Sequence, residues 1–80
     1  MRVLFFGKFG ERFGPAHEVE TEPGDTPITI AERMFDADAD ALEALCHRST
    51  SYIVDHAVVP SDHVLDKAEE LAFLPPVSGG

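Results

Sequence analysis

An 80-residue chain with 44% hydrophobic residues, six of them phenylalanine, is expected to form one small domain with a single modest core. Fifteen acidic against six basic residues give a net charge of −9, which argues against nucleic acid and anionic membranes as partners, because both bind basic surfaces. The single cysteine, Cys46, excludes a disulfide within the chain and suits a reducing compartment. No signal-like cleavage site and no apolar run of roughly 20 residues is present, so we expect a cytoplasmic protein.

The first half of the chain predicts a hairpin followed by a helix. Residues 1–9 form the expected first strand, and its apolar residues on both faces are typical of a strand that is covered on both sides. Residues 10–16 predict a loop, and residues 17–21 predict a second strand antiparallel to the first. Thr26 can cap a helix that starts with Pro27, and apolar residues then recur at helical spacing.

The second half predicts a short helix and three short strands. The acidic, alanine-rich residues 36–40 interrupt the helical pattern, which resumes as a short stripe over residues 41–46. Residues 52–54 and 57–59 are β-prone and are separated by a turn. Residues 71–74 are the expected last strand.

This order of elements predicts an α+β fold with the β-grasp, or ubiquitin-like, architecture. The first and last strands are both strongly apolar, so we expect them to be central and parallel neighbours in a mixed sheet, joined through a crossover that contains the helix. With a helix on one face only, the far face of the sheet has no covering layer. We expect Phe6, Phe73 and Leu74 to lie on this far face and to bind a partner.

The C-terminal residues predict a tail with one reactive group. Residues 1–76 are expected to form the domain and residues 77–80 a flexible tail. Pro75-Pro76 cannot donate hydrogen bonds to a sheet, so they end the last strand and stiffen the root of the tail. Gly79-Gly80 have no side chains and could pass through a channel too narrow for a Cβ atom. The reactive group is then the α-carboxylate of Gly80, which is inert until it is activated.

The other potentially reactive side chains do not match the sequence pattern of a metal site or a catalytic site. The four histidines match no common zinc-ligand spacing. Cys46 and His47 are adjacent on a predicted helix, so their side chains diverge and do not form a nucleophile and base. Asp36, Asp38 and Asp40 alternate as in a calcium loop but lack the glycine and the distal glutamate of that motif. We therefore expect no bound metal or cofactor and no catalytic machinery within this chain.

Four stretches of the sequence resemble the MoaD/ThiS family of β-grasp sulfur carriers. They are VLFFG at 3–7, IVDHAVV at 53–59, DHVL at 62–65 and LAFLPPVSGG at 71–80. The last stretch is similar to the molybdopterin synthase branch of the family, and it is far more specific than Gly-Gly alone. The chain departs from the family at Asp55, where asparagine is usual, and at Lys67-Ala68, where Asp-Gly is usual.

The resemblance implies that a ubiquitin-activating-type enzyme adenylates Gly80 with ATP and that Gly80 is then thiocarboxylated. The tail would insert into the large subunit of molybdopterin synthase, in a heterotetramer, and donate sulfur to a cyclic pyranopterin precursor. The residues expected to bind the partners are Phe6, Phe73, Leu74, Pro75, Pro76, Val77 and Ser78, and those at the reacting end are Gly79 and Gly80. Two other interpretations stay open: a ubiquitin-like modifier conjugated to lysines through Gly80, and the sulfur carrier of thiamin synthesis.

Overall fold

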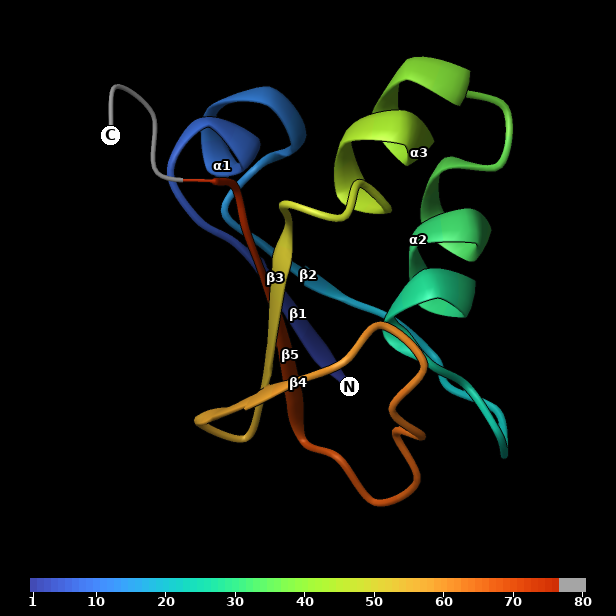
Figure 1. The fold of residues 1–80 in the computed structure, drawn as a ribbon. Helices are drawn as coiled ribbons and strands as arrows, with labels where there is room; N and C mark the ends of the chain where they lie inside the picture. The colour runs from blue at the N-terminus through green and yellow to red at the C-terminus, as the bar shows by residue number, and fades with distance from the viewer. Residues whose placement is uncertain (77–80) are drawn as a thin grey trace.

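Within residues 1–76, which the computed structural model describes, five strands form one mixed sheet in the order β2-β1-β5-β3-β4 (Figure 1). The elements are β1 (Arg2–Phe5), α1 (Lys8–Phe13), β2 (Ala16–Glu18), α2 (Pro27–Phe35), α3 (Ala39–Leu45), β3 (Ser51–Val54), β4 (Ala57–Val59) and β5 (Glu70–Leu74). β1 is parallel to β5, and the other neighbouring strands are antiparallel. The first and last strands therefore lie next to each other inside the sheet, which confirms the predicted β-grasp architecture.

The core lies between one face of the sheet and helices α2 and α3 (Figure 1). The register pairs Val3 with Leu71 and Phe5 with Phe73, so these four side chains share the face that the helices cover. Helix α2 adds Ile30 to the same cluster, which also includes residues of α3 and β3. All of these side chains are almost fully buried.

Phe73 belongs to this core, and its predicted position on the far face is wrong. Its side chain is 0% exposed. Its ring stacks on Phe5, with centroids 5.3 Å apart, and meets Tyr52 edge-on at 5.6 Å. Successive side chains on a strand point to opposite faces of the sheet. Phe73 and Leu74 therefore cannot both face outward, and it is Leu74 that does.

Helix α1 replaces the loop predicted over residues 10–16, and it shortens the first strand, which ends at Phe5. Gly7 is the N-cap of helix α1 and has φ 56° and ψ −133°, a conformation that favours glycine. Gly10 lets the helix approach the strand closely, because a Cβ atom there would lie 2.6 Å from the carbonyl oxygen of Phe5. Phe9 is buried in the core and Phe13 packs against it, one helical turn apart.

Helix α2 begins where the sequence predicts. Thr26 is the N-cap and Pro27 is the first helical residue. The backbone N–H of Thr26 donates to Oγ1 of Thr29 (2.8 Å), and the N–H of Thr29 donates to Oγ1 of Thr26 (3.3 Å), so each satisfies a group that the helix leaves free. The break after α2 is also confirmed, and Asp38 caps α3 by accepting from the N–H of Ala41 at 3.0 Å.

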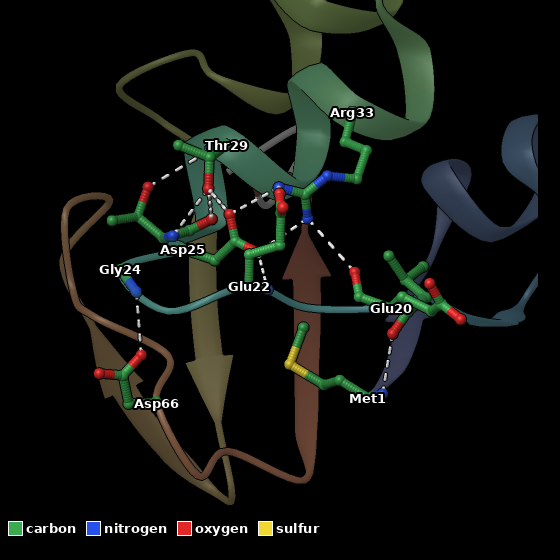
Figure 2. Close-up of polar contacts among 10 residues, drawn as sticks. Met1, Glu20, Glu22, Gly24, Asp25, Thr29, Arg33 and Asp66 are labelled. Carbon is green, nitrogen blue, oxygen red and sulfur yellow. Dashed lines mark hydrogen bonds and ion pairs between the residues drawn. The ribbon is translucent and has the colours of Figure 1, made fainter.

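The buried carboxylate of Asp25 joins the loop before α2 to the helix itself (Figure 2). Both carboxylate oxygens of Asp25 accept from the guanidinium of Arg33, at 2.7 and 2.8 Å. The N–H of Glu22 and the hydroxyl of Thr29 also donate to Asp25, at 2.7 and 2.8 Å. The hydrogen bonds from Arg33 outweigh the effect of burial and, with those from Glu22 and Thr29, hold the pKa of Asp25 well below its ordinary value.

We expect the Asp25 network to make the domain sensitive to acid. A carboxylate whose pKa is lowered by folding stabilises the fold above its unfolded pKa of about 4, and this contribution is lost as the pH falls toward the folded pKa. Asp25→Asn should lower the free energy of unfolding by about 2 kcal/mol near neutral pH and should flatten its dependence on pH below about 4. Urea unfolding at several pH values measures both effects.

The matched control is Asp66→Asn. Asp66 accepts a single exposed hydrogen bond, from the N–H of Gly24 at 3.0 Å (Figure 2), so its replacement should change the stability by only about 0.5 kcal/mol. An Asp25→Asn variant that keeps the pH dependence of the wild type would contradict the expected role of Asp25.

The two departures from the family pattern lie in turns that the structure accommodates. Asp55 and His56 both have positive φ, at 47° and 74°, and form the two-residue turn between β3 and β4. The Asp55 carboxylate accepts from the N–H of Glu70 at 2.9 Å and from that of Glu69 at 3.1 Å, so it ties this turn to the start of β5. In the turn before β5 the positive φ, 69°, falls on Lys67.

Candidate docking face and tail root

A row of apolar side chains crosses the face of the sheet opposite to the core. The register aligns one residue from each strand on this face. In sheet order they are Ala16, Leu4, Ala72, Ile53 and Val58. We call this row, together with Phe6 and Leu74, the docking face. In residues 1–76 no helix packs over it, since α2 and α3 lie on the other side (Figure 1).

The exposed apolar side chains of the docking face lie at two places. Phe6, at the end of the sheet where β5 ends, is 45% exposed, and Val58, on the edge strand β4, is 76% exposed. Leu4, Ile53 and Leu74 are half-buried, and Ala72 is buried. Exposed apolar side chains gathered on one face of a small domain are typical of interaction surfaces, which makes this face the candidate site. The other end of the face is polar.

The polar end is formed by charged residues from the three strands on one side of the sheet. Arg2 pairs in the register with Glu18 and with Glu70, and its Nε lies 3.7 Å from a carboxylate oxygen of Glu70. These charged side chains occupy the end of the face where β5 begins. The apolar side chains occupy the rest of the face, up to the end where β5 ends.

The root of the tail leaves the sheet from the apolar end of the docking face. The N–H of Phe6 donates to the carbonyl of Phe73 at 3.1 Å, which continues the pairing of β1 with β5 up to this point. Pro75 then lies against Gly7, where an added Cβ atom would be 3.3 Å from Cγ of Pro75. The tail root therefore emerges beside helix α1 and next to Phe6 of the docking face (Figure 1).

The structure brings together some of the predicted partner-binding residues. Phe6, Leu74 and Pro75 lie at the apolar end of the sheet, and Pro76 follows them and is exposed. Phe73 does not belong to this surface. Val77, Ser78, Gly79 and Gly80 lie outside the described residues.

Val58 is a surface residue of the docking face that was not predicted from the sequence. Val58 is the most exposed of the large apolar side chains noted on the described part of the chain. Its signal was the alternation within the run of residues 57–59: the register pairs Val58 with Ile53 on the docking face, while Val59 pairs with Tyr52 on the core side. Once the face of Tyr52 is known, the face of Val58 follows.

Potentially reactive side chains outside the docking face are hydrogen-bonded or partly buried. The hydroxyl of Tyr52 donates to the carbonyl of Leu45 at 2.7 Å, and burial raises its pKa to about 12. Burial also raises the pKa of the half-buried Cys46 thiol, which makes it a poor nucleophile. His47 is hydrogen-bonded to the hydroxyl of Ser49 at 2.6 Å. Across residues 1–76, no three side chains of the metal-binding types come together, and no helix is long and apolar enough to span a bilayer.

The fold, the apolar face and the tail root beside it define a protein of the ubiquitin-like β-grasp class. A family model described as the ThiS family matches residues 3–80, and the chain belongs to this family. Members of the family are small ubiquitin-like sulfur carriers, which partner with activating enzymes and with the large subunit of a synthase. No match to the chain is found among curated proteins.

Proposed function

We propose that this chain carries sulfur for molybdopterin synthesis on the carboxylate of Gly80. The position of the tail root, next to the apolar docking face, is the observation that supports a carrier role. A partner that binds this face receives the residues after Pro76 at the same time. The motif from Phe73 to Gly80, with its double proline, favours the molybdopterin pathway over the thiamin pathway.

The proposed chemistry is a cycle in which the chain supplies the carboxylate and its partners supply the catalytic groups. An adenylating enzyme directs the Gly80 carboxylate onto the α-phosphorus of ATP and releases pyrophosphate. A sulfur nucleophile then attacks the acyl carbon, and AMP leaves with the carboxylate oxygen. In the synthase the thiocarboxylate sulfur attacks a carbon of the pterin precursor, and an oxygen substituent leaves that carbon. Hydrolysis of the acyl–sulfur bond then leaves the sulfur on the precursor and restores the carboxylate.

The docking face explains why such a carrier needs a domain as well as a tail. Binding of the apolar row and of Phe6 would remove apolar area from water and hold the tail root at the entrance of a partner's channel. Holding the reacting group in place in this way replaces a bimolecular encounter with a step inside one complex. The same face would serve the adenylating enzyme and the synthase in turn.

Intact mass spectrometry tests the proposal directly. The chain is incubated with a ubiquitin-activating-type enzyme, ATP and a sulfide source, and then with the synthase large subunit and the pterin precursor. We expect one sulfur-for-oxygen exchange that depends on ATP, followed by return to the starting mass with the large subunit and precursor. Lysine conjugates without this exchange would support the ubiquitin-like modifier instead. Exchange that is discharged only by the thiamin-pathway acceptor would support the thiamin carrier.

A further inference from the structure

Gly7 stands between Phe6 of the docking face and the first residue of helix α1, and the fold holds it from both sides. Its φ and ψ lie in a region that is essentially open to glycine alone. Its carbonyl oxygen accepts from the N–H groups of Gly10 at 3.0 Å and Glu11 at 3.3 Å, on the helix side. On the sheet side, the N–H of Phe6 donates to the carbonyl of Phe73. Gly7 therefore has a fixed place relative to the docking face.

The ring of Pro75 lies on the backbone of Gly7. A Cβ atom added at Gly7 would be 3.3 Å from Cγ of Pro75 and 3.8 Å from its Cδ, so a side chain there would press on the ring. Pro75 is half-buried. Pro76, the last of the described residues, is exposed and has no atom within 4 Å of that Cβ position. The contact with Gly7 therefore holds the first proline of the tail root and not the second.

Small changes of direction at Pro75 become large at the end of the tail. Pro75 has a fixed φ, and the residue before a proline is biased toward an extended conformation. Six extended residues, 75–80, span about 20 Å. A rotation of about 10° at Pro75 would move the end of an extended tail by about 3.5 Å, the length of one residue. Since a misplacement of about 1 Å can cost about a hundredfold in rate, the direction at Pro75 matters for any reaction at Gly80.

We propose that Gly7 is a positioning residue for the tail: its backbone supports the ring of Pro75 and so sets the direction in which the tail leaves the docking face. This inference rests on the proposed sulfur-carrier function and adds a residue outside the tail to it. Because Gly7 follows Phe6 directly, one short segment carries both a docking side chain and the support of the tail. A partner that binds Phe6 would receive the tail at a preset angle, and less entropy would be lost when the Gly80 carboxylate is placed.

Pro75→Ala and Pro76→Ala are a matched pair of variants that test this role. Each removes one ring from the tail root, but only Pro75→Ala removes ring atoms that contact Gly7. The chain at position 75 stays biased toward an extended conformation in Pro75→Ala, because Pro76 still follows it. The measurement is ATP–pyrophosphate exchange by the adenylating enzyme as a function of the concentration of the carrier, with a melting curve for each variant.

We expect Pro75→Ala to lower kcat about tenfold with KM for the carrier nearly unchanged, because the domain still binds and only a fraction of the bound tails has the right direction. Pro76→Ala should lower kcat about twofold at most. Both variants should melt near the wild-type temperature, since the core within residues 1–76 is intact. Equal losses of kcat would mean that only the stiffness of the chain matters, and the role of Gly7 would be overturned. An unchanged kcat in Pro75→Ala, or a loss that appears in KM alone, would overturn it as well.

Gly7→Ala, introduced into each proline variant, tests the contact itself. Alanine strains the backbone at this φ, so the melting temperature should fall in both backgrounds. The effect on kcat should differ: a further loss of about fivefold in the Pro76→Ala chain, and little further loss in the Pro75→Ala chain, which lacks the ring. Equal further losses would contradict the proposal. If Gly7→Ala does not fold, the two proline variants decide by themselves. If the wild-type chain supports no exchange, the proposed function fails and the positioning role with it, a result distinct from exchange that is insensitive to Pro75.

Discussion

Phe73→Asp is expected to unfold the domain, whereas Leu74→Asp, one residue further along β5, is expected to leave it folded and unable to bind the synthase large subunit. Phe73 is 0% exposed and stacks on Phe5. Replacing it with a carboxylate removes an aromatic ring from the core and buries a charge, at a cost of about 4 kcal/mol or more. A loss of that size consumes most of the stability of a small domain. Far-ultraviolet circular dichroism against temperature measures it.

Leu74→Asp places the same charge on the docking face, where solvent can reach it. We expect an affinity for the large subunit at least about a hundredfold weaker, because a carboxylate is desolvated without a partner at the centre of an apolar contact. Val58→Asp should act similarly and is the safer variant, since Val58 is 76% exposed and contributes little to the core. Isothermal titration calorimetry measures the binding.

The control for both docking variants is Val64→Asp. Val64 is 51% exposed and precedes Leu65, whose N–H donates to the carbonyl of Asp25 on the helix side of the sheet. We expect binding to be unchanged in this variant. Wild-type affinity in Leu74→Asp and Val58→Asp would show that the large subunit binds elsewhere.

Gly79→Val, or deletion of Gly80, is expected to abolish activation of the carrier. Valine has a branched Cβ and a restricted φ, so it should not pass through a channel shaped for glycine. Deletion of Gly80 still leaves a carboxylate, on Gly79, but moves it back by about 3.5 Å. A displacement of this size from the reaction centre costs at least about a hundredfold in rate. ATP–pyrophosphate exchange by the adenylating enzyme measures the loss.

The same variants should melt at the wild-type temperature, because the core within residues 1–76 is unchanged. They should also bind the large subunit through an intact docking face. Extension of the chain by one residue after Gly80 should fail in the same way as the deletion, since the added residue occupies the place of the reacting group. Undiminished exchange by these variants would mean that Gly80 is not the activated group.

The elements of the sheet could be predicted because their apolar patterns are strong. Residues of β1 and β5 are apolar on both faces, and burial between helices on one side and a docking surface on the other requires that pattern. Which side chain takes which face could not be predicted from such strands, since alternation is what normally distinguishes the faces. For that reason the sequence predicts that Phe73 and Leu74 both face outward, although neighbouring residues on a strand face opposite sides.

Helix α1 escaped prediction because its residues give weak helix signals. Gly7 and Gly10 are poor helix formers, and Gly14-Pro15 reads as a loop. Two features of the folded chain compensate: the burial of Phe9, and the close approach of Gly10 to Phe5, which only a residue without a side chain allows. Both are tertiary effects. The sequence likewise gives no signal for the Asp25–Arg33 ion pair, because the two residues are eight positions apart and one lies in a loop and the other in a helix.

Because β5 lies in the centre of the sheet, the docking face is complete only when the chain has been synthesised to the end of the domain. Arg2 pairs with Glu70 and Phe5 with Phe73, so the first strand, which pairs early with β2, finds its second neighbour, β5, only after almost the whole chain has been made. A chain that stops before β5 leaves β1 and β3 without their shared neighbour, and the row from Leu4 to Ile53 is interrupted at Ala72. Such long-range pairing delays folding. It also means that a truncated chain lacks both the tail and the complete docking face, so under the proposed function incomplete molecules would not compete with complete carriers.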